Sequence, residues 1–381
     1  FINFLSSLKI CFKILNMTRR ELNIKVFEGN AEKVLWQPRL ETWIYYHRKN
    51  NSLPDSFKDL SDFEIYDQLG CSIRYGASRG LYEFNEEPVE IFERIIDENH
   101  IESVLRTKWG DLRTVYQIVK ENENKRIVKF PVENVGELKI LTNLVRNKRY
   151  VFVEEIFKES DRKLGKRAAP TIFLSSSGFT DLIKFYSGLL NAYYLLQDYP
   201  KEVEEYLSAC DERDERMIKE ILKSDCRIFN LGDHATNEFT PPPILEKYLL
   251  PRWQKIGEIM KKNNRFVHSH WDGNSKLILK YIKVSNLSGI EALTPYPQCD
   301  MSLEEIKEAV GNDFVVLDLI PAIFFLPSYS TDFVLDFTKR VIEMFFPKLI
   351  LGVSDELPPF GDIKKIEKIS EYIYKEFGKI E

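Results

Sequence analysis

Short apolar segments alternate with amphipathic helical segments through much of the chain. Strands that are apolar on both faces and separated by helices are typical of a parallel sheet with helical crossovers. Adding two earlier runs brings the number of such segments to eight, the number of strands in a closed (β/α)8 barrel. The apolar runs are 34–40, 150–157, 170–175, 226–232, 265–271, 289–294, 314–320 and 348–354. We therefore predict an α/β fold of TIM-barrel type.

Residues 76–148 interrupt this alternation. Within them, Arg106–Ile127 has the pattern of strands around a turn at Trp109-Gly110-Asp111. Alternating residues on either side of a glycine-containing turn are typical of a β-hairpin. We predict a small antiparallel insertion at about 76–148, within a single domain that spans 17–381.

The first residues, 1–16, are apolar but are interrupted by Lys9 and Lys13. This stretch is too short and too charged to span a bilayer, and no small-residue cleavage site follows it. Met17 opens a segment with a helical pattern. We expect 1–16 to be a non-native extension upstream of the true start.

Composition excludes several classes of function. The net charge of −5 and the lack of a long basic run argue against a nucleic acid partner. No later run of 18 uninterrupted apolar residues exists, so we expect no membrane span. The five cysteines are scattered without a CxxC pair, which favours a reducing, cytoplasmic location. Neither GxGxxG nor a P-loop occurs, so nicotinamide and nucleoside triphosphate chemistry have no support.

Polar residues follow the apolar runs at their carboxyl ends. In a parallel barrel these ends converge on one rim, where the active site lies. We therefore expect the site among these positions. They are Arg39, Ser175–Ser177, Asp233, His234, His268, His270, Glu291, Thr294, Asp318, Asp355 and Glu356.

His268 and His270 are the strongest candidates for chemistry. Residues at i and i+2 of a strand face the same side, so both imidazoles point the same way. Two histidines with one or two carboxylates from neighbouring strands can bind Zn²⁺ and leave a position open for substrate. The alternative is a pair of hydrogen-bonded histidines in the core or against a substrate. Each strand-end acid, taken singly, more often holds a hydrogen bond or caps a helix than binds a metal. Similarly, Trp36, Trp43 and Trp271 can line a site for a ring-shaped substrate or pack in the core.

Residues 226–378 resemble the uroporphyrinogen decarboxylase superfamily, (β/α)8 barrels that also include cobalamin-dependent methyltransferases. The resemblance is carried by NLGDHATNEFTPPPILEKYLLPRWQKIGEIMKK, FVHSHWDGNSKLIL, GIEALTPYPQCDMSLEEIKEAVGN and LILGVSDELPPFGDIKKI. The segments MTRRELNIKVFEG, VLWQPRLETWIYYHRKNNSLP and FPVENVGELKILTNLV are also similar to that family.

Two branches of the superfamily can be compared with this chain. The decarboxylases carry an arginine-rich N-terminal motif, whereas here Arg39 follows Gln37 and Pro38 with no second arginine beside it. The zinc methyltransferases of coenzyme M systems carry His-x-Cys and a later Cys. In this chain, His268 matches the histidine, His270 stands at the first cysteine and Asp355 stands near the second. The combination of HSHWDG, EALTP and LGVSDELPP looks most like the corrinoid-dependent O-demethylase methyltransferases, which act on methoxylated aromatics.

The resemblance implies methyl transfer from a small methylated donor to the Co(I) of a corrinoid on a partner protein, with Zn²⁺ activating the leaving group. It implies the metal ligands His268, His270, Glu291 and Asp355. It further implies catalytic roles for His234 and Glu356, and substrate contacts from Arg39, Asp233 and Trp271. Two alternatives remain: a decarboxylase of porphyrinogen or a related polycarboxylate, and a non-catalytic barrel that binds a tetrapyrrole or corrinoid. A homodimer is compatible with each of these functions.

Overall fold

The computed structural model describes residues 17–77, 79–119 and 124–380. The predicted upstream extension, 1–16, lies outside these residues. Among the helices of the described chain, none has both the length and the hydrophobicity that crossing a membrane requires.

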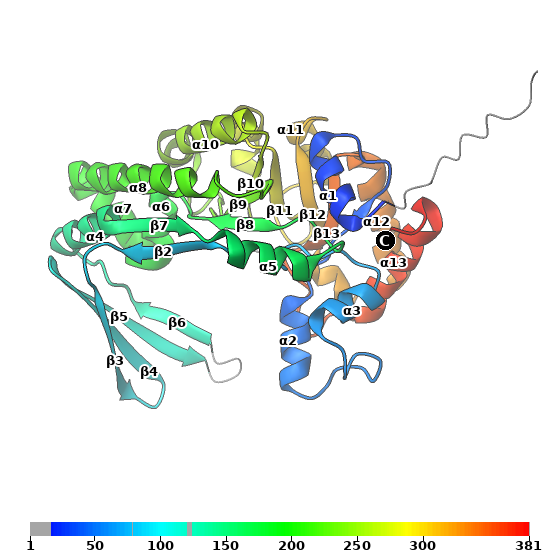
Figure 1. Cartoon of the computed structure of the whole chain (residues 1–381), viewed down its shortest axis with the longest axis horizontal. Coiled ribbons are helices and arrows are strands. Elements are labelled where there is room, and N and C mark those ends of the chain that lie inside the picture. The colour runs from blue at the N-terminus through cyan, green and yellow to red at the C-terminus, as the bar shows by residue number, and fades with distance from the viewer. Residues whose placement is uncertain (1–16, 78, 120–123, 381) are drawn as a thin grey trace, which may run out of the picture.

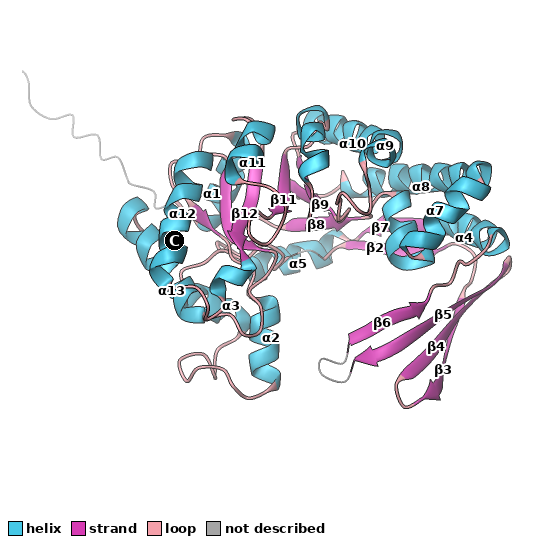
Figure 2. Ribbon diagram, turned by 180° about the vertical axis from the view of Figure 1, so that it is seen from behind, coloured by secondary structure: helices cyan, strands magenta, loops and turns pink. Residues whose placement is uncertain are grey.

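The centre of the molecule is a curled sheet of seven parallel strands, with helices on its outer side (Figures 1 and 2). Its strands are short and almost entirely buried, which explains why their sequences are apolar on both faces. The structure confirms an α/β fold of TIM-like type, but the sheet is an open half-barrel and not the predicted closed eight-stranded one. In spatial order the strands are β1 (Leu35–Trp36), β13 (Leu349–Ser354), β12 (Val315–Pro321), β11 (Gly289–Leu293), β10 (Phe266–His270), β9 (Ile228–Leu231) and β8 (Thr171–Leu174).

The predicted strand at 150–157 does not join this sheet. Instead β7 (Lys148–Phe152) pairs antiparallel with β2 (Leu81–Asn85) in a separate two-stranded sheet. Helix α5 (Glu154–Leu164) begins two residues after β7 ends. A short apolar run identifies a strand without specifying its partner, and here the partner is an antiparallel strand from much earlier in the chain.

Residues 71–75 lie beside β1, next to the open edge of the sheet. The backbone N–H of Ser72 donates to the carbonyl of Trp36 at 2.8 Å. The Ser72 hydroxyl donates to the carbonyl of Arg167 at 2.7 Å, just before β8. The segment therefore contacts both edges of the sheet without forming a regular ladder, and it carries two residues of the candidate site.

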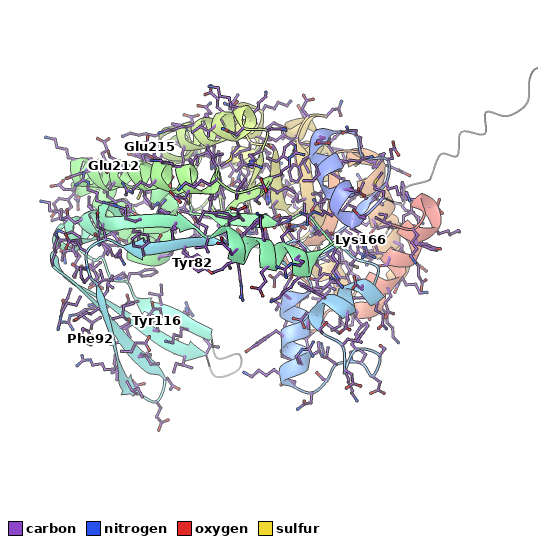
Figure 3. The ribbon with its side chains drawn as sticks, in the orientation of Figure 1. Tyr82, Phe92, Tyr116, Lys166, Glu212 and Glu215 are labelled. Carbon is purple, nitrogen blue, oxygen red and sulfur yellow. The ribbon has the colours of Figure 1, made fainter. Side chains whose placement is uncertain are left out.

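Helices cover the outside of the sheet. In α8, Glu212 and Glu215 face solvent (Figure 3), whereas Arg213 and Asp214 between them are buried. Such a split is the amphipathic pattern of a helix that packs one face on a core. The helices are α1 (Arg19–Glu28), α2 (Glu41–Lys49), α3 (Asp62–Gln68), α4 (Val135–Asn147), α5, α6 (Gly178–Asp181), α7 (Leu189–Asp198), α8 (Pro200–Ile221), α9 (Pro242–Ile244), α10 (Leu250–Lys262), α11 (Leu303–Val310), α12 (Thr331–Phe345) and α13 (Ile363–Phe377). The described chain also contains π-helical segments at Leu182–Ser187 and Leu245–Leu249. It contains 3₁₀ segments at Lys276–Val284 and Ala322–Phe325.

A four-stranded antiparallel sheet projects from the body of the molecule (Figures 1 and 2). It consists of β3 (Glu90–Asp97), β4 (His100–Thr107), β5 (Gly110–Val119) and β6 (Asn124–Lys129). Gly110 ends the β4–β5 turn with φ +138°, and a Cβ there would lie 2.5 Å from Ile140 Cδ1, so the turn requires glycine. The chain enters this region soon after Tyr75, which belongs to the candidate site.

Candidate active site at the strand ends

The carboxyl ends of β10 and β11 bring two histidines and a glutamate together. His270 and Glu291 are directly paired in the parallel ladder. As a result, Nδ1 of His270 lies 3.4 Å from Oε2 of Glu291, and Nδ1 of His268 lies 3.7 Å from the same oxygen. All three side chains are buried. Three of the four predicted metal ligands therefore meet at one point.

The Glu291 carboxylate is held by a dense set of donors. The Tyr75 hydroxyl lies 2.7 Å from both oxygens, Arg74 Nη1 donates at 2.8 Å and Asn230 Nδ2 donates at 2.5 Å. Burial alone would raise the pKa of Glu291, but the charges of Arg74 and His270 hold that pKa well below its usual range. Glu291 is therefore a buried carboxylate ion whose oxygens already have protein partners.

Arg74 joins the ends of β11 and β12. Its guanidinium donates to Asp318 at 2.7 and 2.9 Å, in addition to its bond to Glu291. Asp318 has φ +87°, a conformation that L residues rarely adopt, and a Cβ on the facing Gly352 would lie 2.4 Å from its Oδ1. Arg74 and Tyr75 were not identified as site residues from the sequence, because they lie in an irregular segment with no strand pattern.

A second cluster lies at the mouth of the same site. His234, His270 and Asp272 offer ligand atoms that all lie within 4.8 Å of one another. His234 Nδ1 is 2.9 Å from Asp272 Oδ1, and His270 Nε2 is 3.7 Å from that oxygen. Burial opposes ionisation of Asp272, but the hydrogen bond from His234 and the charge of His270 lower its pKa. We call this group the mouth cluster.

His270 belongs to both groups through its two ring nitrogens. Nδ1 faces the buried Glu291, whereas Nε2 faces Asp272 and has no hydrogen-bond partner among the described residues. Burial lowers the pKa of His270, but the hydrogen bond and charge of Glu291 outweigh it and raise the pKa to about 9. The carboxylate therefore fixes the ring with Nε2 directed at the mouth cluster.

His268 has a different environment. It is fully buried, and in the described part of the chain neither ring nitrogen has a hydrogen-bond partner. Burial lowers its pKa to about 4, so the ring is neutral at pH 7. Asn230, which pairs with His268 in the β9–β10 ladder, also has an unpartnered side-chain oxygen.

Asp355 and Glu356, the other two predicted acids, bind Arg39. Arg39 Nη1 lies 2.5 Å from Asp355, and Nη2 contacts Glu356, which also accepts from Thr42. The guanidinium lies 5.2 Å from the centre of the Tyr75 ring. The predicted ligand Asp355 is thus paired with a cation, although its charge also acts on His270, and its role as a metal ligand stays a prediction. Arg39, predicted to bind substrate, is itself paired with acids of the protein.

Asp233 and Trp271 do not face the site. Asp233 is fully buried and accepts from Ser177 N–H and Trp253 Nε1, each at 2.7 Å. Trp271 is fully buried against Trp253, with ring centres 5.3 Å apart. Both side chains therefore already have protein partners, and their contact with substrate stays a prediction. The other tryptophans of the expected aromatic wall, Trp36 and Trp43, are buried as well.

The residues present fit a zinc ion best at the mouth cluster. Imidazole nitrogen and carboxylate oxygen are ordinary Zn²⁺ ligands, and Nε2 of His270 is an unpartnered buried nitrogen that points there. Glu291 is less suited to ligation because Arg74, Tyr75 and Asn230 occupy its oxygens. Asp272 was not among the site residues predicted from the sequence. The signal that identifies it is its spacing, two residues beyond His270.

Comparison with known proteins gives matches in sequence and in structure. The model of the uroporphyrinogen decarboxylase (URO-D) family matches residues 117–375. A methyltransferase from Methanosarcina mazei aligns with a TM-score of 0.57 at 11% identity, over 94% of this chain and 99% of its own. A B12-independent methionine synthase from Shewanella sp. W3-18-1 aligns with a TM-score of 0.39 at 10% identity, over 90% of this chain and 97% of its own. No curated protein matches the chain.

Proposed function

The chain belongs to the uroporphyrinogen decarboxylase (URO-D) family, and we propose that it is a methyltransferase that moves a methyl group from a methoxylated aromatic donor to the Co(I) of a corrinoid protein. One observation carries the proposal. His270 is fixed by Glu291 through Nδ1 and presents Nε2 to His234 and Asp272. A carboxylate that orients a histidine from behind is the usual support of a catalytic metal ligand.

In this proposal His234, His270 and Asp272 hold Zn²⁺, with a position left for substrate. Zinc supplies a Lewis acid that stabilises negative charge on the leaving oxygen. Such help is needed because a phenolate, with a conjugate acid of pKa about 10 by analogy with tyrosine, leaves poorly at neutral pH. The cobalt of the corrinoid supplies the nucleophile.

The other residues of the site act on these three ligands. Glu291 would hold the proton on Nδ1 of His270, and the second proton, on Nε2, would be replaced by zinc. Arg74 pairs with both Glu291 and Asp318, and its charge helps to keep Glu291 ionised. At Asp318 burial outweighs the charge of Arg74 and raises the pKa to about 6. We revise the sequence-based ligand set accordingly: His270 stays a ligand, Glu291 becomes its support, and Asp272 replaces Asp355. His268 remains a neutral imidazole beside them.

The decarboxylase alternative has less support from the site. Binding a porphyrinogen with several carboxylates requires cationic groups that are free to pair with them. Among the described residues at the strand ends, the guanidinium groups of Arg39 and Arg74 are each paired with two acids of the protein. The third alternative, a barrel that binds a corrinoid without catalysis, is distinguished from a methyltransferase by measuring zinc content and methyl transfer together.

The test combines metal analysis with a methyl-transfer assay. We expect about one zinc per purified chain, as in other catalytic zinc sites, and formation of methylcobalamin from reduced cobalamin and 4-methoxybenzoate. His270→Ala should lose both, and the matched control His100→Ala, on the projecting sheet, should lose neither. A metal-free wild-type protein that transfers methyl groups would overturn the metal site. Bound zinc without transfer from any methoxylated benzoate would favour the non-catalytic alternative.

A further inference from the structure

A cavity of about 400 Å³ opens beside the mouth cluster, at the carboxyl ends of β8 and β9. His234 forms part of its wall, so the cavity and the cluster share a residue. A volume of this size is typical of a site for a small molecule. The reaction proposed above uses only the end of the cavity at His234, which leaves the rest to be explained.

Two of the three cations in the cavity wall have acidic partners. Lys148 lies 2.7 Å from Glu83, and Arg213 lies 2.7 Å from Asp181. Lys184 differs, because no carboxylate in the described chain forms an ion pair with it. Its Nζ donates to the carbonyl of Gly232 at 3.1 Å. Nζ also lies 4.9 Å from the centre of the Phe185 ring. An ammonium group has three N–H donors, and the bond to Gly232 uses one of them.

The acids whose charges act on Lys184 are Asp181, Asp233 and Asp272. Each has another partner that holds it. Asp181 accepts from Arg213, Asp233 accepts from Trp253 and Ser177, and Asp272 is bonded to His234. Lys184 is therefore a half-buried cation in an otherwise paired wall, which favours an anionic ligand.

The same wall presents aromatic side chains. Phe173 and Phe185 are 46% and 48% exposed, although large aromatic residues normally lose most of their exposure on folding. Phe173 packs on Tyr75, with ring centres 4.3 Å apart, so it is held in place next to the site. Exposed aromatic faces in a cavity favour a ring-shaped ligand.

The backbone around Lys184 also departs from regular helix. Lys184 and Phe185 lie in the π-helical segment Leu182–Ser187, between α6 and α7. An extra residue in a helical turn redirects side chains, and such segments are frequent at functional sites. Here both an ammonium group and an aromatic ring are directed to the cavity.

We propose that this cavity binds the methyl donor as an aromatic carboxylate, with its ring against Phe173 and Phe185 and its carboxylate on Nζ of Lys184. Lys184 is bonded to Gly232, two residues before His234. The carboxylate-binding ammonium therefore lies in the same cavity wall as His234 of the mouth cluster. This assignment of substrate class rests on the proposed methyl transfer, but carboxylate binding itself does not require transfer.

The test is calorimetric titration with 4-methoxybenzoate and with its neutral counterpart, 4-methoxybenzyl alcohol. We expect wild-type protein to bind the benzoate about tenfold more tightly than the alcohol, since a charge-assisted hydrogen bond contributes about that factor. Lys184→Met should remove this preference and leave alcohol binding unchanged, and Lys184→Arg should restore part of it. The matched control is Lys255→Met, which removes a surface lysine paired with Glu215.

Equal binding of the benzoate by wild type and Lys184→Met would overturn the assignment, as would no binding of either ligand. Its failure can be told apart from failure of the proposed function. Binding of 4-methoxybenzoate that depends on Lys184, without methyl transfer, supports the cavity assignment and contradicts the methyltransferase. Methyl transfer that is unchanged in Lys184→Met supports the methyltransferase and contradicts the cavity assignment.

Discussion

The imidazole of His270 lies with Nδ1 3.4 Å from Oε2 of Glu291, its direct neighbour on the adjacent strand. Because the two residues share a ladder position, their distance is set by the sheet and not by a loop. The pairing makes the two ring nitrogens unequal. One is turned to a buried carboxylate, and the other faces the more open mouth of the barrel, where His234 and Asp272 lie.

Glu291→Gln should weaken zinc binding by about 10- to 100-fold, the usual cost of losing a carboxylate behind a metal-bound histidine. The amide keeps the size of the side chain but removes the charge that raises the pKa of His270. Competition with a chromophoric chelator measures the affinity. Asp318→Asn is the control, because it removes the other carboxylate on Arg74 without touching a histidine. Equal affinities in the two variants would contradict the role given to Glu291.

The substitutions Asp272→Asn and Asp355→Asn distinguish the mouth cluster from the ligand set inferred from the sequence, which includes Asp355. The first removes a carboxylate that lies within 4.8 Å of the ligand atoms of His234 and His270. The second removes one that is paired with Arg39. We expect zinc content to fall to well below half in Asp272→Asn and to stay at the wild-type level in Asp355→Asn, as measured by plasma mass spectrometry. The opposite result would restore the ligand set inferred from the sequence.

Arg74→Met should destabilise the protein by about 3–5 kcal/mol, because it leaves two buried carboxylates without their cation. Chemical denaturation of metal-free protein gives the free energy of unfolding. Arg340→Met is the matched control: Arg340 and its partner Glu304 have side chains that are 55% and 60% exposed, and such surface pairs contribute about 0–1 kcal/mol. A loss of under about 1 kcal/mol in Arg74→Met would show that the network is not needed for stability.

The sequence predicts the part of the site that depends on strand periodicity. His268 and His270 face the same side because they are two residues apart on β10, and Glu291 joins them because β11 is the next strand in the sheet. The alternation of side chains along a strand follows from the local sequence, and the order of strands in the sheet follows from the fold class. The sequence is therefore sufficient to predict that these three residues lie together.

The rest of the site and of the fold depends on contacts between residues far apart in the chain, which no local sequence pattern predicts. Arg74 meets Asp318, 244 positions later in the chain, from a segment with no strand periodicity. Whether Asp272 or Asp355 reaches the histidines depends on the path of each loop after its strand, and Arg39 holds Asp355 elsewhere. Likewise, the prediction that the apolar run near residue 150 joins the barrel is wrong, because its partner β2 lies much earlier in the chain, in a segment without a clear pattern.

His268 should make the stability of the metal-free protein depend on pH. Its pKa is about 4 in the folded protein against 6.5 in the unfolded chain, because burial disfavours the charged ring. Below pH 6.5 the unfolded chain therefore takes up a proton that the folded protein does not. The free energy of unfolding should fall by about 3 kcal/mol as the pH drops from 6.5 to about 4. His268→Leu should remove this part of the slope, and the half-exposed His100, changed to Leu, should leave it intact. Urea denaturation at several pH values in this window measures the slope. An unchanged slope in His268→Leu would mean that His268 is already charged, and hence paired, in the folded protein.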